Sequence, residues 1–511
     1  MPYPVTAPSR PHRLAPAIFS LLLLVSVSLG ATPPAGSITI EQRAVTTPDG
    51  QTIDYELGTL FVPENRADPQ SRIIGVGFAR FRALQPTGAP PTFHLPGGPG
   101  GSYVRGLNLT KPDPAQRVLN ERQAHDLALY RAAGDVVYVD QRGASDLGDR
   151  LAFRYEVPAA PLDQPGSLAR ETADFVAAAK AAVADARSRG LDLAGYTVKE
   201  CADDVNDLRA ALGYDRVTLI GQSYGSQWSF ATMRRHPSIV ARAVLSGVEP
   251  IDCGYDMPSH IYAAMLRSWW AAEKTPELQP YLPPGGIAGA VRVIIRRLEQ
   301  APLRVPLKDA KTGAESVVVL GRDDFRPGDP RSILAIYHGH YEGWAQNVAR
   351  RRRARTATIE LIGPVIDSGL AVTPLRRHLL RNDAAIAVLG EWNFDEYMAT
   401  EEIWPSPDVG DDFRTERLCD IPVVFVHGDW DTSTPVENLL HVLPFFTRSR
   451  TVLVHQGLHS AYAQVRASLP DATAAIMDFV RSGDTINLPA QVTVPARGPA
   501  IPEFSLPSST R

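Results

Sequence analysis

Short, mainly apolar segments alternate along the chain with segments of helical pattern. Apolar runs of four to eight residues bounded by turn residues are typical of buried strands. Here they are residues 91–95, 135–139, 217–220, 241–248, 422–426 and 451–454. Between them, residues 168–187 are rich in alanine and residues 202–212 form a second helical candidate. Strands that alternate with helices indicate a doubly wound, mostly parallel sheet with helices on both faces, so we predict an α/β fold.

This alternation is preceded and interrupted by segments of other character. Residues 38–83 contain alternating, β-branched segments split by turns, which predict early antiparallel strands. Residues 251–417 are mostly helical in pattern, and we expect them to form a helical cap inserted into the α/β core. The predicted organisation is a signal peptide at 1–30, core at 31–250, cap at 251–417, core again at 418–487, and a proline-rich tail at 488–511. Within the cap, the helical candidates are residues 261–273, 288–300 and 374–389.

The motif Gly221-Gln222-Ser223-Tyr224-Gly225 lies between a predicted strand and a predicted helix. A serine on such a sharp turn is held in a strained backbone conformation with its hydroxyl exposed above the sheet, and the flanking glycines let neighbouring backbone pass closely. We interpret the motif as a nucleophile elbow with Ser223 as the nucleophile.

A serine nucleophile needs a base, usually an imidazole oriented by a carboxylate. In doubly wound hydrolases the chain order is Ser, then Asp or Glu, then His. Asp431 and His459 follow in that order, each in a loop after an apolar segment, at the sheet edge where such folds place ligands. We favour these two over Asp429 and His455, which lie in the same loops.

The oxyanion that forms during acyl transfer needs backbone donors. The elbow supplies the N–H of Tyr224, and the second donor is expected from the glycine-rich loop after residues 91–95. We assign that role to Gly98, because side-chain-free residues let main-chain N–H groups approach a substrate.

Composition narrows the classes of partner. The net charge of −4 over 511 residues creates no broad positive potential that would attract nucleic acid, which we exclude as a partner.

Residues 17–29 are apolar and follow Arg10 and Arg13, a pattern that resembles a secretory signal peptide cleaved after Gly30. Thirteen residues span roughly 20 Å, short of the ~30 Å hydrocarbon core, so we expect no stable membrane anchor. The predicted location is periplasmic or extracellular.

Three cysteines, Cys201, Cys253 and Cys419, permit one disulfide in an oxidising compartment, and the sequence leaves the pairing open. None has the spacing of a metal site or of a C-x-x-C redox pair. We expect neither a metal nor an organic cofactor. The sequence leaves the oligomeric state open as well.

The motifs together resemble a known family. Residues 94–101, Asp140-Gln141-Arg142-Gly143 and the elbow are similar to the proline iminopeptidase and tripeptidyl aminopeptidase group of α/β hydrolases, peptidase family S33. Gly428-x-x-Asp431-x-x-Thr434-Pro435 looks like that group's acid loop. The resemblance implies Ser223, Asp431 and His459 as the triad, with Gly98 and Tyr224 as oxyanion donors. The chain departs from the family in having Ala144-Ser145 where a second glycine is common, and Leu95-Pro96 before the first glycines.

We therefore predict a secreted aminopeptidase that acts through an acyl-enzyme on a peptide or small acyl substrate. Such an enzyme must hold the free α-ammonium with a carboxylate. Glu249, which follows a predicted strand, is one candidate, and the acidic segment 391–397 with Glu401 and Glu402 is another. The alternatives are an esterase or small-amide hydrolase with the same triad, and a noncatalytic binding protein on a hydrolase scaffold.

Overall fold

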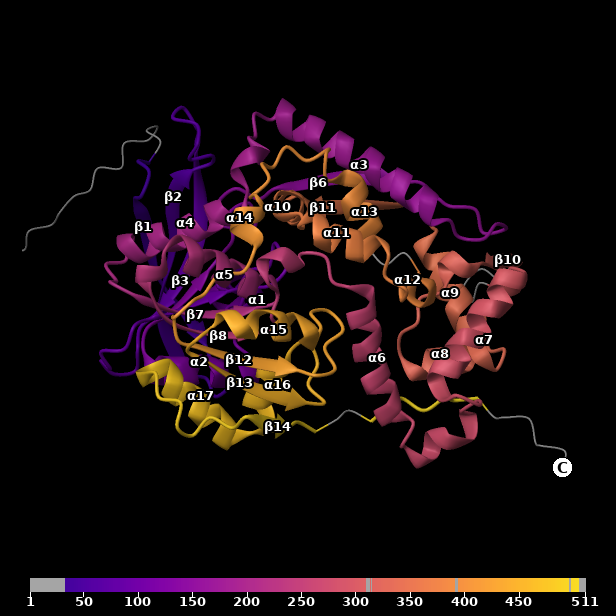
Figure 1. Cartoon of the computed structure of the whole chain (residues 1–511). Helices are drawn as coiled ribbons and strands as arrows, with labels where there is room; N and C mark the ends of the chain where they lie inside the picture. Colours follow the sequence, from indigo (N-terminus) through magenta and orange to yellow (C-terminus); the bar gives the residue numbers. More distant parts are fainter. Residues whose placement is uncertain (1–32, 309–312, 314, 391–393, 496–497, 505–511) are drawn as a thin grey trace, which may run out of the picture. The chain divides into compact units, whose positions relative to one another are not determined.

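The computed structural model describes residues 33–308, 313, 315–390, 394–495 and 498–504. The predicted signal peptide and residues 391–393 of the acidic segment lie outside the described residues. From Pro34 onward the described chain forms one compact unit, which Figure 1 traces from the early strands to the C-terminal segment.

A single large sheet organises the chain. Its N-terminal strands β1, β2 and β3 are antiparallel, as is the β3–β5 pair, and every pair from β5 onward is parallel. The strand order is β1-β2-β3-β5-β4-β7-β8-β12-β13-β14. The strands are β1 (Ile38–Thr46), β2 (Thr52–Pro63), β3 (Ile73–Phe81), β4 (Thr92–Leu95), β5 (Val136–Val139), β7 (Val217–Gln222), β8 (Val240–Ser246), β12 (Val423–Gly428), β13 (Ser449–His455) and β14 (Gln491–Thr493). The prediction of a doubly wound, mostly parallel sheet with early antiparallel strands is confirmed.

The two faces of the sheet carry separate hydrophobic cores. Successive residues of β5 alternate between them, with Val137 and Val139 in one core and Val136 and Tyr138 in the other. Burial on both faces explains why the central strands are continuous apolar runs. The first core includes side chains of α3 (Leu168–Ser188), α4 (Val198–Ala211), α5 (Tyr224–Arg235) and α15 (Val436–Val442). The second includes side chains of α1 (Tyr103–Gly106), α2 (Glu121–Ala133), α16 (Ala461–Ser468) and α17 (Pro470–Ser482).

Between β8 and β12 the chain leaves the sheet for a mainly helical insertion with its own apolar core (Figure 1). Its elements are α6 (Pro258–Ala272), α7 (Gly286–Gln300), the hairpin β9 (Leu303–Lys308) and β10 (Glu315–Leu320), α8 (Pro330–Tyr337), α9 (Glu342–Arg351), β11 (Arg355–Glu360), α10 (Ile362–Leu370), α11 (Pro374–Arg381), α12 (Ile386–Leu389), α13 (Phe394–Thr400) and α14 (Asp411–Arg414). Short 3-10 turns link the elements here and in the core: η1 (Pro114–Gln116), η2 (Leu193–Gly195), η3 (Pro237–Ile239), η4 (Ile251–Cys253), η5 (Pro276–Tyr281), η6 (Arg322–Asp324) and η7 (Leu443–Phe445). The cap boundaries at 251 and 417 stay a prediction.

One part of this accessory region comes from earlier in the chain. β6 (Ala152–Val157) pairs antiparallel with β11, with Ala152 opposite Glu360, and α3 contacts α13. From the sequence we expected this stretch in the core, because an alternation of strands and helices does not reveal which strand pairs outside the main sheet.

Three local features differ from expectation. The helix expected at 374–389 is broken after Arg381, where the Asp383 carboxylate accepts the N–H of Ala385 (2.8 Å) and that of Ser259 (2.9 Å). The proline-rich tail contributes the short strand β14, which has too few residues to show a period. All three cysteines carry free thiols, so the disulfide that an oxidising compartment permits is not formed.

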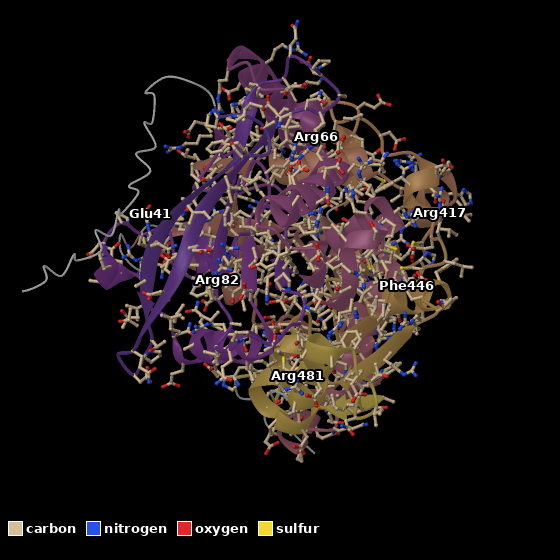
Figure 2. All side chains as sticks on the ribbon, turned by 90° about the vertical axis from the view of Figure 1, so that its left-hand side faces the viewer. Glu41, Arg66, Arg82, Arg417, Phe446 and Arg481 are labelled. Atoms are coloured by element: carbon tan, nitrogen blue, oxygen red, sulfur yellow. The ribbon has the colours of Figure 1, made fainter. Side chains whose placement is uncertain are left out.

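Two further observations concern the surface arginines and membrane spans. The arginines labelled in Figure 2 lie on separate elements, and Arg66 and Arg82 are bound to carboxylates. In the described part of the chain, no helix is both long and apolar enough to cross a bilayer.

Candidate active site

Ser223 lies on a strained turn between β7 and α5. Its backbone angles are φ 58° and ψ −131°, in the left-handed half of φ that side chains rarely adopt. A Cβ at Gly221 would lie 2.4 Å from the carbonyl oxygen of Gly225, and a Cβ at Gly225 would lie 2.1 Å from that of Leu95. Only glycine therefore fits at these two positions, where the turn packs against β4. This explains why the motif has a glycine at each end.

Asp431 and His459 form a buried acid–base pair. Asp431 is only 1% exposed, and its Oδ2 and Oδ1 atoms lie 3.0 and 3.2 Å from Nδ1 of His459. The backbone N–H groups of Ser433 (2.8 Å) and Thr434 (3.0 Å) donate to Oδ1. Burial alone raises the pKa of Asp431, but the hydrogen bond and charge of His459 outweigh burial and lower the pKa below its usual value. The carboxylate is thus held ionised and aimed at the imidazole.

The His459 ring lies over the end of β8, the strand next to the elbow. A Cβ at Gly247 would lie 3.1 Å from its Cε1 atom, and Gln222 Nε2 donates to the His459 carbonyl (3.3 Å). Within the described residues, His459 Nε2 forms no hydrogen bond, and none joins the ring to Ser223 Oγ. Such contacts often tighten only when substrate binds. The three residues predicted as a triad thus follow β7, β12 and β13 at one edge of the sheet.

The pH dependence of kcat/KM tests whether the His459 imidazole acts as the base. Burial lowers the pKa of His459, but the hydrogen bond and charge of Asp431, together with the charge of Asp256, raise it above 6.5 overall. A base must be neutral, so we expect kcat/KM to fall as the pH drops through this raised pKa. Asp256→Asn removes one negative charge that favours the imidazolium and should move the acidic limb to lower pH. The measurement is kcat/KM from pH 5 to 9 with a fluorogenic substrate.

Asp412→Asn is the matched control for that profile, because Asp412 is 97% exposed and its change should leave the limb in place. An acidic limb that stays fixed in Asp256→Asn would show that Asp256 does not act on the imidazole.

A second acid–base pair lies in the same two loops. His455 Nδ1 is 2.7 Å from Asp429 Oδ2, and the N–H of Gln456 donates to Asp429 Oδ1 (2.8 Å). These are the two residues that the sequence left as alternatives. The ring of His459 lies against Gly247 at the end of β8, and its carbonyl accepts a hydrogen bond from Gln222, the residue before Ser223. The pair Asp431–His459 is therefore the one on the nucleophile's side of the loops.

The glycine loop lies directly against the elbow. A Cβ at Gly97 would lie 3.1 Å from Ser223 Cβ, and the adjacent Gly98 has φ 133°. Over the described residues, the backbone N–H groups of Gly98 and Tyr224 find no protein acceptor. Two unpaired donors beside a serine hydroxyl are what an oxyanion site requires.

Asp140 and Gln141 tie this loop to the elbow. Gln141 Oε1 accepts the N–H of Gly100 (2.7 Å), while its Nε2 donates to the hydroxyl of Tyr224 (3.2 Å). Asp140 accepts the hydroxyls of Ser102 (2.6 Å) and Ser145 (2.9 Å). The chain departs from the family pattern at Ala144-Ser145, but the loop is still anchored there, because the Ser145 hydroxyl donates a hydrogen bond to Asp140.

A cavity of about 430 Å³ opens beside Ser223. Glu249 lines it, as proposed from the sequence, and Asp256 and Asp367 line it as well. Sequence reasoning missed both aspartates, because they stand in the insertion outside any motif. The other lining residues are Gly98, Pro99, Gly254, Tyr255, Ile261, Tyr397, Thr432, Ser433 and Thr434.

The three carboxyl groups are held in an environment that disfavours their charge. Burial, with repulsion from Asp256 and Asp367, raises the pKa of Glu249 well above its usual value. Burial raises the pKa of Asp256 to about 7 and that of Asp367 to about 7. No described lysine or arginine lines the cavity, and the Arg376 guanidinium donates to the Tyr255 carbonyl (2.7 Å). The cavity is therefore suited to a positively charged group.

The acidic segment near residue 397 is only partly at the site. Tyr397 lines the cavity, whereas Glu401 accepts the hydroxyl of Tyr255 (2.9 Å) and pairs with Arg377 (2.9 Å). Glu402 is exposed. Residues 391–393 lie outside the described part of the chain.

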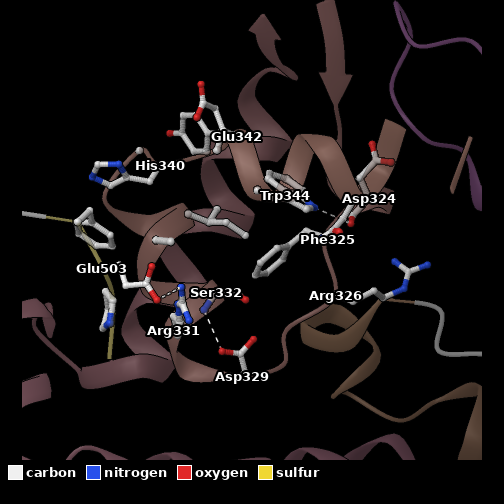
Figure 3. A pocket seen from close by; sticks show the side chains of 18 of the residues that line it. Asp324, Phe325, Arg326, Asp329, Arg331, Ser332, His340, Glu342, Trp344 and Glu503 are labelled. Carbon is white, nitrogen blue, oxygen red and sulfur yellow. Dashed lines mark hydrogen bonds and ion pairs between the residues drawn. The ribbon is translucent and has the colours of Figure 1, made fainter. Parts of the chain in front are cut away.

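A larger cavity of about 1260 Å³ lies elsewhere, between α8, α9 and the C-terminal segment (Figure 3). The ion pair of Arg331 with Glu503 (2.7 Å) lies at its wall, and Phe504 stacks on His340. None of the residues predicted to be functional lines it, so we place the chemistry at Ser223. Over the residues described here, no group of acidic, histidine or cysteine side chains has the arrangement of a metal site.

Comparison with known proteins supports the fold. A family model described as the alpha/beta hydrolase fold matches residues 173–272, which include the elbow. No curated protein matches the chain. Solved structures that resemble it include an epoxide hydrolase from hot-environment metagenomes (14% identity, 87% of this chain and 100% of that chain, TM-score 0.34) and a thermophilic esterase from Thermogutta terrifontis (14%, 83% and 98%, 0.32).

The chain thus has the α/β hydrolase fold. The matched segment 173–272 and the strand order of the sheet carry this statement. The solved structures are too distant to indicate a substrate. The comparisons do not separate peptidase family S33 from other hydrolases of this fold, so that resemblance stays a prediction.

Proposed function

We propose that the protein is a serine hydrolase that removes residues from the free N-terminus of peptides. In this mechanism Ser223 Oγ attacks the scissile carbonyl while His459 Nε2 takes the hydroxyl proton, and Asp431 stabilises the resulting imidazolium. The N–H groups of Gly98 and Tyr224 donate to the oxyanion. The C–N bond then breaks, and His459 returns the proton to the leaving amine.

The second half of the reaction releases the acyl group. A water molecule gives a proton to His459 and attacks the ester of Ser223, and collapse of the second tetrahedral intermediate returns the proton to Ser223 Oγ. This chemistry needs no group beyond the side chains and backbone donors already described.

The observation that carries the aminopeptidase proposal is the set of carboxylates beside the nucleophile. Glu249 lines the same cavity as Ser223, and its side chain has no hydrogen-bond donor among the described residues. A free α-ammonium would supply three donors and a positive charge. A neutral acyl group would instead leave these carboxyl groups without a partner, at a free-energy cost.

An esterase or small-amide hydrolase is the second candidate, because the same triad and oxyanion donors serve any acyl transfer. The two candidates differ in what the carboxylates do. Only the aminopeptidase depends on a free amino group next to the scissile bond.

The test compares aminoacyl- and tripeptidyl-arylamides with their N-acetylated forms and with acyl nitrophenyl esters. We expect the free-amine arylamides to be hydrolysed and N-acetylation to abolish their turnover. Glu249→Gln should lower kcat/KM for the free-amine substrates by about 30-fold or more, because the ammonium loses a buried charged partner. Asp412→Asn should change nothing. If only the esters react, and blocking the amine makes no difference, the aminopeptidase proposal fails and the esterase stands.

A further inference from the structure

The cavity beside Ser223 contains more carboxyl groups than one α-ammonium requires. Glu249, Asp256 and Asp367 come from three separate segments: the loop after β8, the loop before α6, and α10. A single α-ammonium carries one positive charge, so it can ionise and pair with one of these carboxyl groups, while burial favours the protonated form of the others. A second cation on the substrate could pair with another of the three.

The two aspartates have different surroundings. Asp256 accepts a hydrogen bond from Asn438 (2.6 Å), and its charge helps to raise the pKa of His459. Asp367 stands in α10, which begins beside the glycine loop, because a Cβ at Gly100 would lie 3.0 Å from Ile362 Cγ2. All three carboxyl groups line one cavity, and the charges of both aspartates raise the pKa of Glu249.

This arrangement separates the leaving-group side from the acyl side. His459 must hand a proton to the leaving amine, so the leaving group occupies the side of the cavity near His459 and Asp256. We assign Asp367, whose helix α10 begins beside the glycine loop, to the acyl side, where the substrate's first residue lies. Within the described residues, the Asp367 carboxylate forms neither a hydrogen bond nor an ion pair, which leaves it available to a ligand.

The wall around Asp367 suits a long side chain with a charged end. Tyr255, Tyr397 and Ile261 line the same cavity and offer aromatic and apolar surface to a chain of methylene groups. A cation at the end of that chain gains from the carboxylate and from nearby aromatic rings. The volume of about 430 Å³ is large enough for one such residue.

We propose that the enzyme selects peptides whose first residue is lysine or arginine, with the α-ammonium at Glu249 and the side-chain cation at Asp367. This inference rests on the proposed aminopeptidase function. It assigns Asp367 as a specificity-determining residue.

The experiment compares lysyl-arylamide with norleucyl-arylamide, because norleucine has the same methylene chain as lysine without the amine. We expect kcat/KM for lysyl-arylamide to exceed that for norleucyl-arylamide by about tenfold or more, the effect of one charge-assisted contact. In Asp367→Asn the ratio should fall towards one, because lysyl turnover should fall more than norleucyl turnover. Asp412→Asn should keep the wild-type ratio.

Several results overturn the inference. A wild-type ratio near or below one refutes it, as does an Asp367→Asn enzyme in which both substrates slow equally. If that variant does not fold, Nε-acetyl-lysyl-arylamide with wild-type enzyme replaces it, and turnover equal to that of lysyl-arylamide is again a refutation. Hydrolysis of norleucyl-arylamide without preference for lysine overturns only this inference. Failure of every free-amine arylamide, with turnover of esters, overturns the proposed function itself.

Discussion

Ser223→Ala is expected to lower kcat by about 10⁴-fold or more. Without the serine nucleophile, water must attack the substrate carbonyl directly, and only the oxyanion donors remain to stabilise the intermediate. The side chain is small and lies at the mouth of a cavity, so the fold should be retained. The measurement is hydrolysis of a fluorogenic arylamide and of a nitrophenyl ester, alongside far-UV circular dichroism.

Labelling with a fluorophosphonate completes this test. The wild-type protein should gain one adduct on Ser223, and Ser223→Ala should gain none. Ser188→Ala, at the exposed end of α3, is the control and should label and turn over as wild type does. A folded wild-type protein that forms no adduct would favour a noncatalytic binding protein on a hydrolase scaffold.

The second large effect is expected for Asp431→Asn. An amide cannot stabilise the imidazolium, and its N–H₂ group facing Nδ1 favours the tautomer that carries the proton on Nε2, where the base must be free. We expect kcat to fall by about 10⁴-fold with KM changed little. Steady-state kinetics at a pH above the pKa of His459 measure this loss.

Asp429→Asn is the matched variant, because Asp429 Oδ2 lies 2.7 Å from Nδ1 of His455, the last residue of β13. The fall in kcat of this variant should be small by comparison, on the order of tenfold or less. The reverse order of effects would move the base from His459 to His455 and contradict the assignment.

Much of the sheet was predictable because buried parallel strands need apolar side chains on both faces, and Val136–Val139 and Val423–Gly428 show that requirement plainly. The elbow was predictable because a Cβ at Gly221 or Gly225 would lie within 2.5 Å of a backbone oxygen, so only glycine fits at either position. Both are local requirements, so they leave a pattern in a few consecutive residues.

Of the three acidic residues that line the substrate cavity, only Glu249 was predictable. Asp256 and Asp367 reach it from a loop and a helix of the insertion, and no spacing in the sequence records that they meet. The pairing of β6 with β11 could not be predicted for the same reason, because it joins residues about two hundred positions apart. Long-range contacts of this kind depend on how the insertion folds against the core.

The strand order also sets when activity can arise during synthesis. β8 and β12 are neighbours in the sheet, although β8 ends at Ser246 and β12 begins at Val423. At roughly 5–20 residues per second, the ribosome adds Asp431 and His459 on the order of ten seconds or more after Ser223. On the proposed mechanism, a nascent chain with a finished elbow has a nucleophile but no base. Its chemistry can begin only after the last parallel strands have docked.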